Sequence, residues 1–201
     1  MATMMLATGG FMLMPFGSAF TVENLGIPLA KLPVIYMVTG AVTLVAGPLL
    51  GKLADTIGKY KLFVIGSVAG AALVALYCNL GRTPLATVLL INAVLFVAIT
   101  CRMISATALV SAVPDMPDRG AFMSVNASVQ QFSGGVASSL AGLIVVQAPS
   151  GPLLHYDVLG YVVVGAMTLT VVLMYPIHRA VMRKAALAAT AAANPGTVAA
   201  E

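Results

Sequence analysis

Long uncharged hydrophobic runs alternate along the chain with short segments that hold its charged and turn-forming residues. An α-helix needs ~20 apolar residues to cross the hydrocarbon core of a bilayer, and the runs have this length. The pattern predicts an all-α membrane protein, a six-transmembrane-helix bundle over residues 1–184. The expected spans are about 3–22, 32–51, 62–80, 84–107, 121–147 and 157–177. Residues 185–201 are expected to form an Ala-rich cytoplasmic tail that extends the last helix and then frays.

The composition excludes the soluble classes of protein. Hydrophobic residues make up 60% of the chain and charged residues 8%, whereas soluble domains carry about 25% charged residues. A soluble enzyme, a nucleic-acid-binding domain and a disordered chain are therefore all excluded. The net charge of +4 has to be examined as a topology signal before it is taken as a sign of an acidic partner.

The basic residues gather on one side of the predicted bundle. Seven of them fall in the segments on the side of the two termini: Lys52, Lys59, Lys61, Arg119, Arg179, Arg183 and Lys184. The opposite side has only Lys31 and Arg82. Cytoplasmic loops are enriched in Lys and Arg, so both termini are expected in the cytoplasm, with the chain in a bacterial inner or plasma membrane. The topology accounts for the basic charge, and no nucleic-acid partner is expected.

The segment between the second and third spans has a distinctive order of residues. It reads Gly51-Lys52-Leu53-Ala54-Asp55-Thr56-Ile57-Gly58-Lys59-Tyr60-Lys61. The glycines permit a tight turn with close backbone approach, and Asp55 can accept from the N–H groups of a neighbouring helix N-terminus, a contact worth ~0.3–2 kcal/mol. A short positive-inside loop with one counter-charge explains the same residues, and from the spacing alone both interpretations stay open.

This segment resembles the loop signature G-x-L-a-D-r-x-G-r-k of the major facilitator superfamily. Five residues match in order and spacing: Gly51, Leu53, Ala54, Asp55 and Gly58. Lys59 stands in the place of the usual arginine, while Thr56 and Tyr60 replace basic residues. The resemblance implies a gating loop made by the five matching residues and Lys59.

Two further segments carry the same resemblance. Residues 114–124, with Asp118, Arg119 and Gly120, are similar to the cytoplasmic loop that leads into the eleventh helix of these proteins. Residues 126–131 are similar to sequences in arabinose-efflux-like and drug-efflux permeases. The resemblance implies the C-terminal half of a secondary active transporter that exports sugars, drugs or other small solutes by alternating access.

These carriers rock two six-helix bundles about a site at the bilayer midplane, and six helices supply one bundle. Because Met1 falls where a seventh helix would begin, the chain is expected to be a fragment that needs an N-terminal six-helix half, missing or separate. A homodimeric half-transporter and a non-transporting assembly subunit are the alternatives. Reconstituted flux would separate a carrier from an assembly subunit.

The fifth span holds most of the polar residues. A stripe at helical spacing contains Ser124, Ser128, Gln131, Gly135, Ser138 and Gly142, and an adjoining face contains Asn126, Gln130 and Ser133. Such groups must face protein or water, because unpaired amides are costly in hydrocarbon. Asn126, Ser128, Gln130 and Gln131 are the candidates for lining a solute cavity. Packing between helices is the alternative, and it is favoured for Gly134, Gly135, Ser138 and Gly142.

Arg102 is the one charge expected within the membrane. Either it is buried and needs a partner or a wet cavity, or it reaches the interface along its apolar stem. The hypothesis for the buried case is that Arg102 lines the cytoplasmic vestibule and binds an anionic group or gates the path. No carboxylate and no histidine falls mid-span, so the coupling carboxylate of a proton antiporter would lie in the other half.

The chain offers no signature of an enzyme or a metal site. A Gly-x-Ser-Gly nucleophile with a histidine inside a span is absent, and so are His/Glu clusters of the metalloenzyme kind. Cys78 and Cys101 lie inside apolar runs and are expected to act as small core residues. No enzymatic activity and no cofactor are expected, and the partners expected are a small solute and the lipid bilayer.

Overall fold

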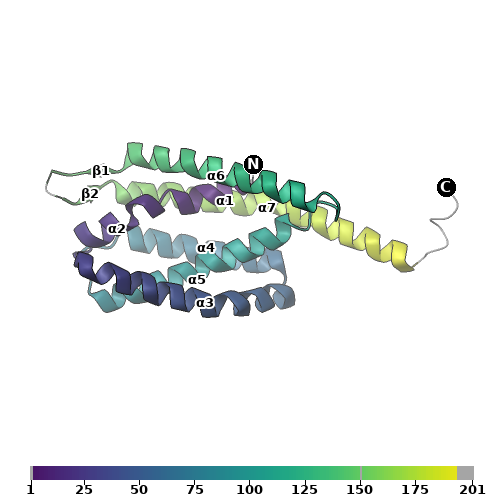
Figure 1. Ribbon diagram of the computed structural model, residues 1–201, viewed down its shortest axis with the longest axis horizontal. Helices are drawn as coiled ribbons and strands as arrows, with labels where there is room; N and C mark the ends of the chain where they lie inside the picture. The colour runs from purple at the N-terminus through teal and green to yellow at the C-terminus, as the bar shows by residue number, and fades with distance from the viewer. Residues whose placement is uncertain (1, 150, 194–201) are drawn as a thin grey trace.

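The computed structural model describes residues 2–149 and 151–193 as a bundle of α-helices that follow one long axis (Figure 1). The helices are α1 (Ala2–Phe11), α2 (Met14–Glu23), α3 (Leu32–Ile57), α4 (Lys59–Cys78), α5 (Leu85–Val110), α6 (Arg119–Ile144) and α7 (Tyr156–Ala193). A 3-10 turn, η1 (Leu29–Lys31), precedes α3, and a short hairpin of β1 (Val146–Gln147) and β2 (Leu153–Leu154) joins α6 to α7.

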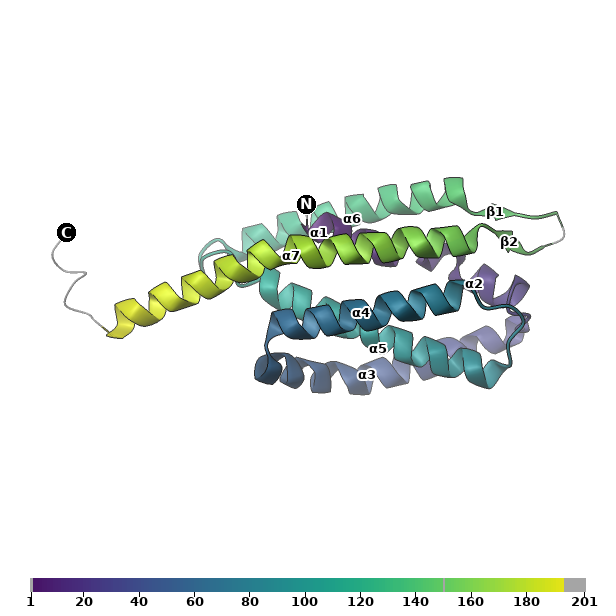
Figure 2. The same ribbon diagram turned by 180° about the vertical axis from the view of Figure 1, so that it is seen from behind.

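The helices form two groups that meet along α4 and α7. In one group α1 packs against both α6 and α7, and in the other α5 packs against both α3 and α4. Figures 1 and 2 show these groups one above the other, with α7 running well past the rest of the bundle. The α3–α4 link and the α5–α6 loop lie at the end of the bundle past which α7 projects, which we call the Gly58 end (Figures 1 and 2). The hairpin lies at the opposite end.

Five helical segments in the described part are long and apolar enough to cross a membrane. They are Ala2–Glu23, Leu29–Ile57, Lys59–Cys78, Leu85–Val110 and Tyr156–Leu187. The predicted all-α membrane bundle is confirmed. The helix α6 spans 26 residues but falls outside this set, because its serines, glutamines and asparagine lower its mean hydropathy. A membrane crossing by α6 stays a prediction.

Several helices end at other residues than the sequence predicts. The second span was expected to end at residue 51, but α3 continues to Ile57 and only Gly58 separates it from α4. Gly58 has φ of +97°, a conformation that residues with a Cβ rarely adopt. The expected loop is therefore helical on both sides of one glycine, because nothing before Gly58 stops the helix.

The ends of the remaining spans also move. The fourth continues past residue 107 to Val110, and α6 ends at Ile144 instead of 147 because Val145 turns extended and leads into β1. The last span was expected to end at residue 177, with the Ala-rich tail extending its helix, and α7 does continue to Ala193, since the alanines after Lys184 are strong helix formers. Residues 185–193 of the predicted tail are thus helical, and 194–201 lie outside the described residues.

The first span is broken into α1 and α2. Pro15 follows the break and stands at the start of α2, where its fixed φ suits a first helical turn. Proline has no N–H to donate to the carbonyl four residues before it, which here belongs to Phe11. The Ser138 hydroxyl of α6 donates to the Phe11 carbonyl oxygen at 3.0 Å. A side chain from a neighbouring helix therefore completes the backbone at the break.

An aromatic cluster ties α2 to α4 and α7 near the hairpin end. The Phe20 ring stacks on Tyr156 with centroids 4.0 Å apart and lies 5.5 Å from the ring of Tyr77. The hydroxyls of Tyr77 and Thr21 share a hydrogen bond of 2.8 Å. All four side chains are buried, so α2 is held firmly on the far side of the break.

Candidate functional site

The helix α6 packs on α1 through small residues. Gly134, Ala137 and Ala141 are buried, and a Cβ on Gly134 would lie 2.8 Å from the ring of Phe11. Glycine is therefore required where the two helices cross. The predicted packing role is found for Gly134 and for Ser138, which makes the hydrogen bond to the break in the first span.

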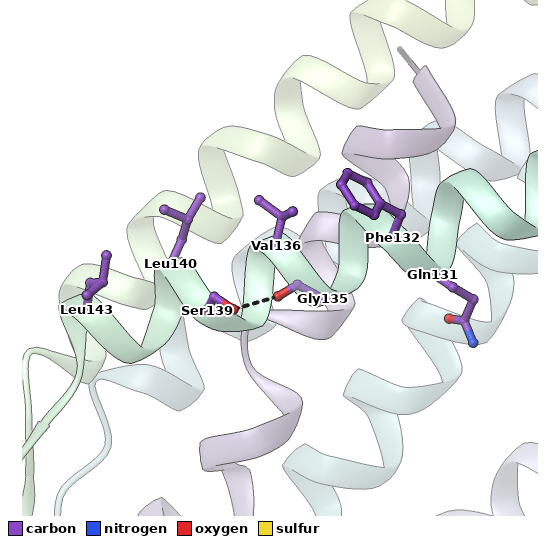
Figure 3. A pocket seen from close by; sticks show the side chains of 7 residues that line it. All are labelled: Gln131, Phe132, Gly135, Val136, Ser139, Leu140 and Leu143. Carbon is purple, nitrogen blue, oxygen red and sulfur yellow. Dashed lines mark hydrogen bonds between the residues drawn. The ribbon is translucent and has the colours of Figure 1, made fainter.

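A shallow groove of about 450 Å³ runs along the opposite face of α6. Its lining consists of Gln131, Phe132, Gly135, Val136, Ser139, Leu140 and Leu143 (Figure 3). The four apolar side chains point to one side of the helix, and the Gln131 amide points to the other (Figure 3). The groove thus lies between an apolar row and a row that contains an amide, a glycine and a hydroxyl. Such a surface suits an amphiphilic solute or a second helix.

The candidate cavity residues divide between exposed and half-buried positions. Ser128 and Gln131 are exposed, whereas Asn126 and Gln130 are half-buried. The Ser128 hydroxyl donates to the carbonyl of Ser124 in its own helix at 3.1 Å, so it is already satisfied. Gln131 is the only one of the four that lines the groove, and it presents both donors and an acceptor there.

Gly135 does not pack against another helix of the described chain. A Cβ at this position would meet nothing within 4 Å, because Gly135 lies on the groove face one residue away from the α1 contact. Gly142 lies between these cases, since a Cβ there would be 4.0 Å from the ring of Phe16. Sequence periodicity placed the stripe on one face, but it could not show where α1 crosses it.

The segment around Asp55 lies at the last turns of α3. Ala54 is buried against Leu62 and Cys101, while Leu53, Asp55 and Gly58 are exposed and Gly51 and Lys59 are half-buried. Among the described residues, none forms an ion pair or a hydrogen bond with the Asp55 carboxylate. Its negative charge is therefore presented outward at the Gly58 end of the bundle, where a group from outside the described chain can reach it.

The α5–α6 loop lies at the same end. Lys184 of α7 forms an ion pair with Asp115 at 2.6 Å and donates to the Val113 carbonyl at 3.2 Å. Asp118, Arg119 and Gly120 follow in the exposed first turn of α6, and the Asp118 side chain does not cap that helix. The loop is thus fastened to α7, while the three predicted loop residues remain accessible.

Tyr60 forms a contact that the sequence did not predict. Its ring stacks on His178 with centroids 4.8 Å apart, and its hydroxyl donates to the Val171 carbonyl at 3.2 Å. Tyr60 stands where the signature has a basic residue. This difference from the signature was the sign in the sequence that the position has another role. In this chain the position joins α4 to α7 instead of adding charge.

Arg102 is buried, with 3% of its surface exposed. The alternative in which it reaches the interface is therefore wrong. Its guanidinium carbon lies 5.7 Å from the centroid of the Phe63 ring, and Nη1 is 3.4 Å from where a Cβ of Gly9 would be. The guanidinium Nε and Nη2 make no hydrogen bond with the described residues. The side chain crosses the bundle from α5 between α4 and α1.

Sequence reasoning missed two buried serines on the same pair of helices, α4 and α5. The hydroxyls of Ser67 and Ser105 are buried and also lack a hydrogen-bond partner in the described part of the chain. The residue in the sequence that could have pointed to this contact is Gly66. A Cβ there would lie 3.0 Å from the backbone nitrogen of Arg102, so the position requires a glycine. This close approach brings α4 directly onto the Arg102 turn of α5.

Residues 2–149 and 151–193 contain no group of three or more His, Cys, Asp or Glu side chains that could hold a metal ion. Cys78 and Cys101 are buried free thiols. The polar chemistry of the described bundle is therefore carried by the groove of α6, the outward Asp55 and the buried Arg102.

Comparison with known proteins gives one match. A family model described as Major Facilitator Superfamily matches residues 1–196, which is nearly the whole chain. No curated protein and no solved structure matches.

Proposed function

Because the chain belongs to the major facilitator superfamily, we propose that it acts as the C-terminal six-helix half of a secondary active transporter. Members of this superfamily are transporters of small molecules in the lipid bilayer, not enzymes. The proposed activity is export of sugars, drugs or other small solutes by alternating access. In such carriers two bundles rock against each other around a central site.

The exposed polar face of α6 is the observation that carries this proposal. Gln131 lines the groove of about 450 Å³ with its amide free of protein partners among the described residues. A bare amide facing lipid tails is costly, so this face requires water or another protein surface opposite it. A solute cavity shared with a second bundle meets the requirement, and the apolar row of the groove would hold the apolar part of a solute.

Asp55 supports the same arrangement. Its carboxylate is exposed at the Gly58 end without an ion pair in the described part of the chain. In the proposed transporter it accepts hydrogen bonds from a helix N-terminus of the second bundle, a contact worth ~0.3–2 kcal/mol. A contact of this size stabilises one conformation and still breaks during transport.

The proposed orientation places the Gly58 end in the cytoplasm of a bacterial inner or plasma membrane. Lys52, Lys59 and Arg119 are at this end, together with the basic residues of α7. Lys and Arg are retained on the cytoplasmic side during insertion, so both termini are cytoplasmic in this proposal. Labelling of a single cysteine introduced at residue 56, from either side of a sealed vesicle, tests the orientation.

The test of function is solute export from cells and from reconstituted vesicles that contain the chain. Gln131→Leu removes the groove amide at similar size and is expected to reduce export at least tenfold. Thr168→Val is the matched control, because the Thr168 hydroxyl is exposed on α7 and donates only within its own helix, at 2.9 Å. Equal export by the Gln131→Leu variant and the parent would refute the assigned role of α6.

The same experiment separates the rival functions. A chain that moves no solute, alone or with a second bundle, is a non-transporting subunit. Disulfide crosslinking through a cysteine at position 131 reports what covers the groove. A crosslinked homodimer that is active in transport replaces the two-half arrangement with a homodimeric half-transporter.

A further inference from the structure

A second polar site lies inside the bundle, separate from the groove of α6. Arg102 of α5 is at its centre, with 3% of its surface exposed. Two other buried polar side chains lie on the same pair of helices: Ser105, three residues after Arg102 in α5, and Ser67, next to Gly66, where a Cβ would lie 3.0 Å from the Arg102 backbone nitrogen. The Phe63 ring lies beside the guanidinium, and the backbone of Gly9 in α1 closes the site on the other side. The guanidinium of Arg102 therefore lies between α4 and α1.

Four polar atoms in this site have no hydrogen-bond partner among the described residues. They are Nε and Nη2 of Arg102 and the hydroxyl oxygens of Ser67 and Ser105. Buried polar atoms in proteins are nearly always paired, and an unpaired group calls for an explanation such as a bound ion. Arginine has only donors, and a serine hydroxyl can donate as well. The set as a whole therefore lacks a negatively charged acceptor for the guanidinium.

No carboxylate of the described chain supplies that acceptor. Glu23, Asp55, Asp115, Asp118 and Asp157 all lie at helix ends or in loops, and the only ion pair in the described part is that of Asp115 with Lys184. The Phe63 ring at 5.7 Å from the guanidinium carbon offers a partial negative face. It neutralises no charge, so a buried guanidinium remains without a counter-ion.

We propose that Arg102, Ser67 and Ser105 form a binding site for a small monovalent anion. A planar guanidinium with two free donor atoms suits a halide or a carboxylate group, and each of the two hydroxyls can donate a further hydrogen bond to the anion. The enclosure by Phe63 and Gly9 limits the ligand to a small group. Inorganic halide and the carboxylate of a small organic acid share this chemistry.

The first span provides the route into the site. Gly9 packs against Arg102 near the end of α1, and the helix is broken after Phe11. A segment that ends at such a break can move without bending a continuous helix. Displacement of α1 exposes the guanidinium to the interior of the bundle and admits the anion.

Thermal unfolding of the purified full chain in different sodium salts tests this proposal. Chloride, bromide and acetate are compared with gluconate, which is too large for the site, at equal ionic strength. A ligand that binds only the folded state raises Tm, and we expect a rise of about 2–8 °C in the salt that fits. A rise in halide identifies an inorganic anion, and a rise in acetate identifies a carboxylate. Equal Tm in all four salts overturns the proposal.

Substitutions assign the effect to the site. Arg102→Met is expected to abolish the salt-specific rise in Tm, whereas Arg82→Met, which changes an exposed arginine in the α4–α5 loop, keeps it. A Ser67→Ala, Ser105→Ala double variant retains the guanidinium and is expected to need about tenfold more anion for the same rise. Persistence of the full effect in Arg102→Met overturns the assignment.

A direct measurement covers the case in which Arg102→Met does not fold. Crystals of the unsubstituted protein grown in bromide are expected to show an anomalous peak within hydrogen-bond distance of Arg102. If halide raises Tm but no peak lies near Arg102, the ion binds elsewhere and the proposal is refuted. The outcome does not depend on solute export, so this site stands or falls separately from the groove of α6.

Discussion

Two neighbouring glycines of α6 are expected to respond in opposite ways to the same substitution. Gly134 lies against α1, and a Cβ there would be 2.8 Å from the Phe11 ring, at the carbon that joins the ring to its side chain. The ring cannot turn away from that contact, so α6 must shift. Gly135 is the next residue in the same helix, and a Cβ there would meet nothing within 4 Å.

The magnitudes follow from two terms. Replacing glycine by alanine inside a helix contributes about 0.5–1 kcal/mol of stability at either position. At Gly134 the added carbon overpacks the α1–α6 contact, which costs about 1–3 kcal/mol. We expect Gly134→Ala to lower the free energy of unfolding by about 0.5–2 kcal/mol, and Gly135→Ala to raise it by about 0.5–1 kcal/mol.

Denaturation of the two variants in detergent micelles measures this difference directly. Each protein is unfolded by titration with a denaturing detergent, and the helical signal in circular dichroism is followed. The pair shares helix, residue type and added volume, so differences in expression or in micelle binding affect both alike. A Gly134→Ala variant as stable as Gly135→Ala would refute the close α1–α6 crossing.

Three further predictions test other contacts of the bundle. Ser138→Ala is expected to cost about 0.5–2 kcal/mol in the same unfolding assay, because it leaves the carbonyl at the break of the first span unpaired; Ser139→Ala, whose hydroxyl bonds only within α6, should change stability little. Gly58→Ala is expected to cost about 1–2 kcal/mol because φ is +97° there, whereas Gly51→Ala, helical and with open space around it, should be neutral or stabilising. Asn24→Ala removes two hydrogen bonds of 2.9 Å to the backbone of β2, and it is expected to speed amide hydrogen exchange in the hairpin without changing exchange in α4.

The helices were predictable because their signal is local. A run of apolar residues between charges determines where a membrane helix lies, and this signal located every span of the bundle, although the last helix runs well past its predicted end. The ends were less predictable. The end of α3 depends on one backbone angle at Gly58, whereas the extension of α7 to Ala193 follows from the high helix propensity of the alanine-rich tail.

The candidate site was predictable only in part. The helical period placed the polar residues of α6 on neighbouring faces, yet Gly134 and Gly135 differ by a single step of about 100° around the helix. One of them faces α1 and the other faces the groove. The choice depends on the angle at which α1 crosses α6, and no residue within α6 encodes that angle by itself.

The sequence alone determined that this is a membrane bundle, through its scarcity of charge, and pointed to the family through the order of residues from Gly51 to Lys59. The apolar runs and the Gly51–Lys59 motif can each be read within a short stretch of chain. Only the tertiary structure decided that Arg102 is buried where Gly66 of α4 approaches it, and that Ser138 completes the broken first span. These features join residues 36 (from 66 to 102) and 127 positions apart, and the surroundings of a buried side chain depend on which distant helices pack around it.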